Sequence, residues 1–202
     1  MFLQKVVRTL LHTSRSPRRG KTSRGQALVE FALFVPLLLT LVLGATDVAT
    51  LLDDHLDIVY AARAGARVGS VIGNFSPSGA TFTADCAVIG AVQAALSSAV
   101  NLQITQIAIY QAPPSGAWSS TLPQDVYPGN TICLPSGAPS NTATTATWIP
   151  STRNHTPFTE DSIGVAIWFS YTYQFNIFGF LPVAPVMPEY AVMPIEIVVS
   201  AP

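Results

Sequence analysis

Residues 20–46 read GKTSRGQALVEFALFVPLLLTLVLGAT, and this stretch decides how the chain is organised. It joins a basic arm, which ends at Arg24-Gly25, to an apolar run that contains a single charged residue, Glu30. As a helix, residues 26–46 would measure about 31 Å, close to the thickness of a bilayer's hydrocarbon core. A carboxylate inside such a helix is costly to bury, which makes Glu30 a candidate functional residue.

Charge is distributed unevenly between the two sides of this junction. Seven of the ten basic residues precede Gly25, whereas all eleven acidic residues follow it. Because positive charge beside an apolar helix marks the cytoplasmic side, we expect a basic cytoplasmic leader (1–25) and a single membrane span (26–46). A Lys/Arg cluster can also bind nucleic acid, but this one adjoins an apolar segment rather than a folded basic face. No nucleic-acid partner is therefore expected.

A secretory signal peptide is an alternative interpretation of the same arrangement. The apolar run is long for the centre of a signal peptide, however, and its far end, Leu43-Gly44-Ala45-Thr46, matches the A-x-A cleavage pattern only loosely. The sequence therefore favours a helix that stays in the membrane, with any cut placed before the apolar segment.

The helix is expected to continue outside the membrane over residues 47–73, because no proline occurs between Pro36 and Pro77. From residue 26 to residue 71 it would measure about 69 Å, and a helix of that length needs partners along its side. Small residues four apart form a flat seam that lets another backbone approach closely, either from a second chain or from this chain's own domain. The seam residues are Ala61, Gly65, Gly69 and Gly73.

Charged residues occur on other faces of the same helix. Arg63 and Arg67 project from a neighbouring face and are candidates for contacts with acids on a partner. Asp53, Asp54 and Asp57 could be considered as metal ligands, but His55 points elsewhere and too few ligands converge to bind a metal. We therefore expect these residues on a solvated helix face. The sequence predicts no metal and no cofactor.

Two motifs on this helix, RGQALVEFA at residues 24–32 and AARAGAR at residues 61–67, closely resemble TadE-like proteins, which are pseudopilins of bacterial Tad (Flp, type IVc) pilus systems. The resemblance covers residues 24 to about 70 and weakens beyond them. It implies that a prepilin peptidase cuts between Gly25 and Gln26, which makes Glu30 the fifth residue of the mature chain. The new α-amine of Gln26 would be protonated, and would pair with Glu30 of a neighbouring subunit.

The resemblance implies a minor pseudopilin that acts in the assembly, the priming or the tip of a Tad-type pilus. Its partners would be the prepilin peptidase, other pilins or pseudopilins and the pilus assembly platform. It would sit in the bacterial inner membrane with a cytoplasmic N-terminus and an extracytoplasmic C-terminal domain, and after processing it could enter the extracellular pilus. The alternative is an unprocessed, single-pass extracytoplasmic binding or adhesion protein, in which Glu30 snorkels to the interface and Gly25 is a hinge.

Residues 74–202 are expected to form a small α+β head, with one helix packed on an antiparallel sheet of about three strands. The helix begins at Thr83, after a Gly/Ser/Pro/Thr linker (74–83), and ends near Val100. Strands are predicted at Leu102–Tyr110, with one irregularity, at Ile163–Phe175, where seven apolar residues alternate strictly, and at Tyr190–Ser200, where Pro194 favours an edge position. Residues 112–157, rich in Pro, Ser and Thr, are expected to be a long loop.

The two cysteines, Cys86 and Cys133, both lie in the exported part. An even number of cysteines in an oxidising compartment favours one disulfide, and two buried thiols are the alternative. No G-x-S-x-G, H-E-x-x-H or phosphate-binding glycine loop occurs, and Glu160 and Asp161 beside His155 resemble ordinary loop charges. We therefore expect a protein that is not an enzyme.

Overall fold

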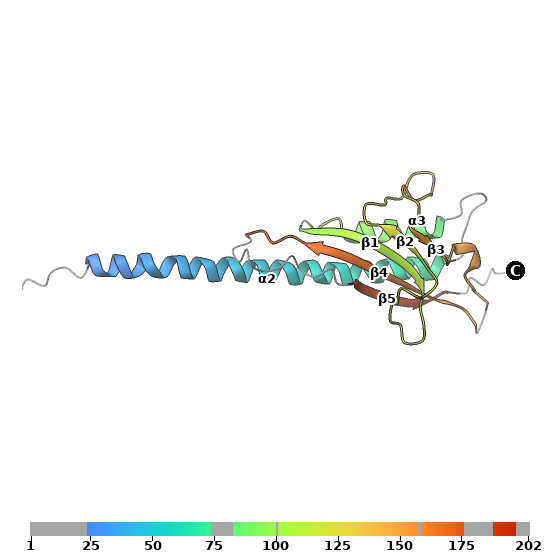
Figure 1. Cartoon of the computed structure of the whole chain (residues 1–202), viewed down its shortest axis with the longest axis horizontal. Coiled ribbons are helices and arrows are strands. Elements are labelled where there is room, and N and C mark those ends of the chain that lie inside the picture. The colour runs from blue at the N-terminus through green and yellow to red at the C-terminus, as the bar shows by residue number, and fades with distance from the viewer. Residues whose placement is uncertain (1–23, 74–82, 100, 157–158, 176–187, 197–202) are drawn as a thin grey trace, which may run out of the picture. The chain divides into compact units, whose positions relative to one another are not determined.

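The computed structural model describes residues 24–73, 83–99, 101–156, 159–175 and 188–196. Contacts divide the chain into two compact units, Met1–Val42 and Leu43–Pro202. One long helix, α2 (Arg24–Ile72), contributes residues to both units (Figure 1).

The described part of the first unit consists only of the start of α2. The helix continues through Pro36, and the Thr40 hydroxyl donates a hydrogen bond to the Pro36 carbonyl at 2.7 Å. Its large apolar side chains are exposed, and the helix is long and apolar enough to cross a membrane. This segment is therefore compatible with the expected single-pass anchor.

The second unit contains a five-stranded antiparallel sheet in the order β3-β2-β1-β4-β5. The strands are β1 (Leu102–Gln111), β2 (Gln124–Pro128), β3 (Thr145–Ala146), β4 (Ser162–Tyr171) and β5 (Pro188–Pro194). A helix, α3 (Thr83–Ala95), and a short 3-10 turn, η1 (Pro150–Thr152), complete the described elements. The α+β class and the antiparallel sheet are thus confirmed, with five strands instead of about three.

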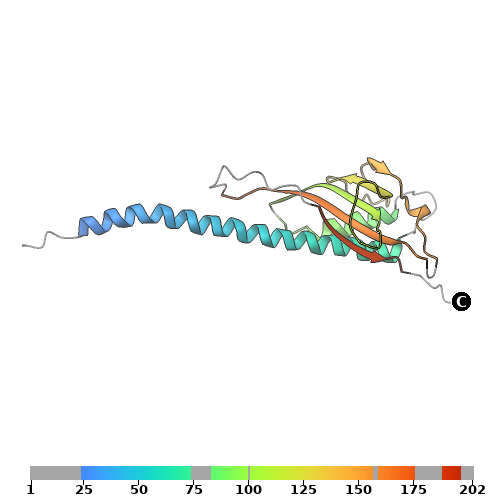
Figure 2. The same ribbon diagram turned by 60° about the horizontal axis from the view of Figure 1, so that its bottom comes forward.

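One face of the sheet carries the main core of the unit. Its side chains pack against α3 and against the C-terminal half of α2 (Figures 1 and 2). In β4 the core residues are Ile163, Val165, Ile167 and Phe169, which is the alternation that the sequence predicts. In β1 the register shifts between Ile104 and Gln106, so that apolar residues before and after this bulge reach the same core. This bulge is the irregularity expected in the first strand.

The opposite face of the sheet carries a second, smaller core. Loop residue Trp118 stacks edge-on against Trp168 of β4, with ring centroids 4.6 Å apart, and donates a hydrogen bond to Gln124. The ring of Tyr110 lies over Gly164, where a Cβ atom would come within 2.2 Å of the ring. The loop before β2 therefore packs on the sheet.

Several element boundaries differ from those predicted. Helix α3 ends at Ala95 and is followed by turns, and β4 ends at Tyr171, four residues before Phe175. The segment expected as a continuous loop contains β2, β3 and η1. β5 lies at the sheet edge, as Pro194 indicated. Residues 197–200 of the predicted third strand and residues 74–82 of the linker lie outside the described residues.

The predicted disulfide between Cys86 and Cys133 is present. It ties the start of α3 to the chain that follows β2. Residues on both sides of Cys133 also bond locally, because Leu134 N donates to Ala138 O and Ser140 N donates to Ile132 O. Part of the segment expected as a loop is therefore held against α3.

Candidate processing and assembly site

The candidate cleavage site lies at the N-terminal end of α2. The helix begins at Arg24, and a Cβ atom placed on Gly25 would meet nothing within 4 Å. The side chain of Gln26 donates a hydrogen bond of 3.1 Å to the carboxylate of Glu30, one turn further along. Gly25, Gln26 and Glu30 are all exposed. Residues 1–23 of the leader lie outside the described residues.

This arrangement has a clear chemical consequence in a membrane. A glycine favours unwinding of the helix end, because it lacks a Cβ and gains conformational freedom when the helix opens. The neutral amide of Gln26 satisfies only part of the hydrogen-bonding capacity of a carboxylate, so Glu30 retains room for a cationic partner.

The seam of small residues faces the chain's own head. A Cβ atom on Gly65 would lie 2.8 Å from Val92 of α3, and one on Gly69 would lie 2.6 Å from Ile163 of β4. A Cβ atom on Gly73 would lie 3.1 Å from Ile195, and Ala61 is fully buried. In the structure this seam is therefore the surface by which α2 packs on α3, β4 and the segment after β5.

Two acidic residues in the middle of α2, Asp47 and Asp54, are buried. Asp54 is buried with only 8 % of its surface exposed, so the expectation of a solvated position is wrong for this residue. Its Oδ2 has no hydrogen-bond partner among the described residues, and burial together with Asp57 and Asp53 raises its pKa. Asp47 is also buried, and it accepts a hydrogen bond from the backbone of Phe175. The sheet and the loop after β4 cover this side of α2.

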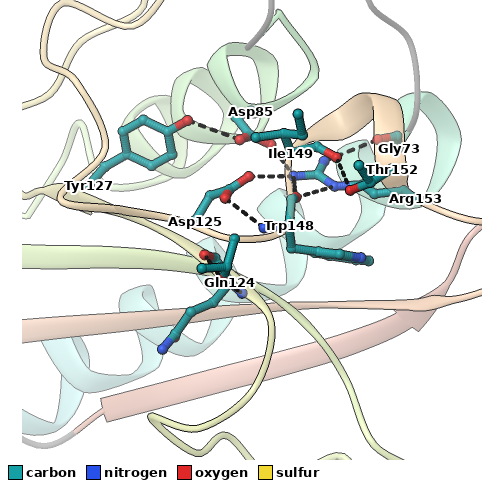
Figure 3. A network of polar contacts seen from close by, with 10 residues as sticks. Gly73, Asp85, Gln124, Asp125, Tyr127, Trp148, Ile149, Thr152 and Arg153 are labelled. Atoms are coloured by element: carbon teal, nitrogen blue, oxygen red, sulfur yellow. Dashed lines mark hydrogen bonds and ion pairs between the residues drawn. The ribbon is translucent and has the colours of Figure 1, made fainter.

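A buried polar network holds the far end of α2 to the head (Figure 3). Arg153, which follows η1, donates to the Gly73 carbonyl at 3.0 Å and to the Trp148 carbonyl, and it forms ion pairs with Asp85 of α3 and Asp125 of β2. Its guanidinium also lies 4.6 Å from the centre of the Trp148 ring. One cation thus joins four segments that are distant in the sequence.

The network contains two buried carboxylates for one buried cation. Burial and the charge of Asp85 raise the pKa of Asp125 to about 7, against an ordinary value of 3.8, although a hydrogen bond from Trp148 N and the charge of Arg153 act in the opposite direction. Tyr127 donates a 2.9 Å hydrogen bond to Asp85, and burial and Asp85 raise the pKa of its hydroxyl. The network is therefore sensitive to pH near neutrality.

Arg63 and Arg67 are exposed on the outer side of α2. Neither has an ion-pair partner among the residues that the structure describes. Both remain accessible to another molecule.

Sequence analysis missed the role of Arg153 and Asp125. One signal existed, because Arg153 is the only basic residue after Arg67 and a lone cation among many acids invites an internal ion pair. Its partners were not predictable, because Asp85 and Asp125 lie 68 and 28 residues away. In the described part of the chain, no cluster of three His, Cys, Asp or Glu residues has a geometry suited to a metal ion.

Comparison with known proteins supports the resemblance to one family. No curated protein and no solved structure matches the chain significantly. The family model described as "TadE-like protein" matches residues 25–67, which begin at the candidate cleavage glycine and end at Arg67. Within residues 25–67 the chain is therefore similar to TadE-like proteins, in agreement with the resemblance of its two motifs.

Proposed function

We propose that this protein is a minor pseudopilin of a Tad-type pilus. It is made as an inner-membrane precursor with its N-terminus in the cytoplasm, and prepilin peptidase trims it between Gly25 and Gln26. It then acts in the assembly, the priming or the tip of the pilus, together with other pilins or pseudopilins and the assembly platform. It acts by assembly and not by catalysis.

The observation that carries the proposal is the TadE-like match that begins at Gly25 and covers the exposed helix end. Apart from the half-buried Val35, the large apolar side chains of residues 28–42 are exposed, as expected of a segment that packs first in lipid and then against neighbouring helices. Glu30 lies in this segment, and its carboxylate needs a partner when neighbouring helices pack around it.

Trimming prepares the helix for assembly in two ways. It removes the seven basic residues of the leader, which hold the helix start at the cytoplasmic surface, and so lowers the barrier to withdrawal of the helix from the membrane. It also creates a protonated α-amine on Gln26, which pairs with Glu30 of the neighbouring subunit. A buried carboxylate without a partner is strongly unfavourable, so the pair selects the correct register of neighbouring helices.

Two substitutions, made in the native host, separate trimming from assembly. In Gly25→Leu the larger side chain blocks the peptidase, and immunoblots should show only the full-length chain. Glu30→Gln keeps the shape of the side chain but removes its charge, so this variant should be trimmed normally and be depleted from sheared pili or assembly complexes. Normal incorporation of Glu30→Gln would refute the pairing role, and a full-length wild-type chain would instead support an unprocessed anchor.

A further inference from the structure

One end of the sheet lies beside Asp47 and Thr50 of α2. The Tyr171 hydroxyl, at the end of β4, lies 2.8 Å from the Thr50 hydroxyl. Beyond the strand, the backbone N–H of Phe175 donates a hydrogen bond of 3.3 Å to the Asp47 carboxylate. The ring of Tyr173 stacks edge-on against Tyr171, with ring centroids 5.2 Å apart. The chain that leaves β4 is therefore fixed along this part of α2.

These contacts place the chain after β4 at a defined depth in a membrane. The apolar run of α2 ends at Thr46, and Asp47 carries the first charge beyond it. At about 1.5 Å per residue, Asp47 lies about 1.5 Å and Thr50 about 6 Å beyond the end of the run. The headgroup layer of a bilayer is about 5–7 Å thick on each side of the hydrocarbon core. When the run spans the core, the chain after β4 is therefore level with the headgroups.

The side chains at this level suit a lipid surface. Phe175 exposes 46 % of its surface, and Tyr173 is half-buried. Tyrosine is enriched at the headgroup level, where its ring contacts apolar groups while its hydroxyl stays in water. No Asp, Glu, Lys or Arg occurs between Asp161 and Glu189, and Asp47 is buried with its carboxylate hydrogen-bonded. No charge of β4 or of the chain after it therefore has to be desolvated on contact with lipid.

We propose that Tyr173 and Phe175 form a tip of the head that inserts into the headgroup region of the bilayer, at the leaflet where α2 leaves it. This contact rests on the proposed function only in requiring that α2 is a membrane anchor. It adds to the span a second membrane contact, which is made by the head. Such a contact fixes the orientation of the head on the membrane before α2 is withdrawn into a pilus.

A lipid surface fits this tip better than a protein partner does. A protein partner would have to reach the headgroup layer beside α2, whereas lipid surrounds every copy of an anchored chain at that level. The sequence that follows Phe175 also favours lipid, because residues 176–188, NIFGFLPVAPVMP, are uncharged and mostly apolar. Apolar surface next to a bilayer gains free energy by leaving water.

Tryptophan substitution with brominated lipids tests the contact in the full chain, reconstituted as a single copy in each nanodisc. Bromine quenches tryptophan only at short range, so lipids brominated near the headgroup (shallow) or near the bilayer centre (deep) report its depth. Phe175→Trp keeps the backbone N–H that bonds to Asp47. Its added fluorescence, measured as the difference from the wild type with its three tryptophans, should be mostly lost with shallow bromine. Tyr173→Trp should give the same result from the second side chain of the tip.

Two matched variants calibrate the signal. Leu38→Trp replaces an exposed side chain near the middle of the apolar run, and deep bromine should quench it more than shallow bromine does. Ile132→Trp replaces a side chain of exposure similar to that of Phe175, next to the disulfide that ties Cys133 to the start of α3. The start of α3 lies at the Gly73 end of α2, about 39 Å along the helix from Asp47, so neither lipid should quench this variant.

The outcomes separate a lipid contact from its alternatives. If bromine quenched Leu38→Trp but neither Phe175→Trp nor Tyr173→Trp, the contact would be overturned and the anchor would stand. Protection of the tip from aqueous iodide would then show that protein covers it, and full access of iodide would show that it faces water. If bromine quenched none of these variants, the anchor would fail and the contact with it. Trimming plays no part in this assay, so the cleavage after Gly25 is tested separately.

Discussion

Replacement of Asp125 by Asn tests the buried network through its dependence on pH. Asn has the shape of Asp but no charge, and its side-chain oxygen can still accept the hydrogen bond from Trp148 N, which is 3.0 Å from Asp125 Oδ1 in the wild type. The substitution therefore removes a titrating group while it keeps one of its contacts. It leaves Arg153 and Asp85 as a single buried ion pair.

The magnitude follows from the raised pKa of Asp125. Folding raises this pKa from 3.8 to about 7, so the folded state holds the proton more tightly than the unfolded state does. The stability from this group is fully present below about pH 4 and is lost as pH rises through 7. At 1.36 kcal/mol per pKa unit, the loss is about 4 kcal/mol over the whole range and about 3 kcal/mol between pH 5 and pH 8.

The assay is urea unfolding of the full chain in mild detergent at pH 5, 6, 7 and 8. Tryptophan fluorescence follows unfolding, and one of the three tryptophans of the chain, Trp148, is buried beside Arg153. The wild type should lose about 3 kcal/mol more than Asp125→Asn over this range. The slope with pH is the readout, because a constant effect of the substitution on stability does not change it.

The control is Glu196→Gln, which neutralises an exposed carboxylate and should leave the slope of the wild type unchanged. Equal slopes for the wild type and for Asp125→Asn would refute the raised pKa of Asp125. If the free energy of unfolding rose with pH in the wild type and not in Asp125→Asn, the result would contradict the sign of the argument.

The remaining predictions concern the stability of the head and of its contact with α2. Arg153→Met leaves two buried carboxylates without their cation and should lower the free energy of unfolding by about 3–5 kcal/mol; a loss below 1 kcal/mol would contradict the role of the network. Gly69→Leu should lower the free energy of unfolding by about 1–3 kcal/mol in thermal or urea unfolding, because even a Cβ atom at this position would lie 2.6 Å from Ile163. Gly90→Ala should instead stabilise α3 by up to about 1 kcal/mol, because its Cβ atom would meet only Cys133, at 3.9 Å. Reduction of the disulfide should lower the stability of the head by about 2–4 kcal/mol, as measured by the urea midpoint with and without reductant.

The long helix and the central strands were predictable because their patterns are local. An uninterrupted apolar run specifies α2, and strict alternation from Ile163 onward specifies β4. Strands β2 and β3 were missed because they are short, with five and two residues. In β2 the polar residues Gln124 and Asp125 are also buried, so the strand lacks the alternation of apolar and polar residues by which strands are predicted. Strands as short as these are specified by their pairing with a neighbouring strand, β2 with β1 and β3 with β2.

The candidate site shows the same division between local and long-range information. Gly25 and Glu30 were identified from neighbouring residues, and their spacing needs no tertiary structure. The seam around Gly65 and Gly69 indicates a close helix contact, but small residues give the same pattern whether the partner is the head or another chain. The burial of Asp54 and the four-way contact of Arg153 depend on segments far away in the sequence. Only the tertiary structure reveals them.

The most direct test of the proposed function is the N-terminus of the protein isolated from the membranes and sheared pili of its native host. Intact-mass spectrometry with N-terminal peptide sequencing should find a chain that begins at Gln26 and lacks the whole basic leader. A chain that still begins at Met1 in the assembled fraction would contradict the proposal, because no α-amine would then be available to neutralise Glu30.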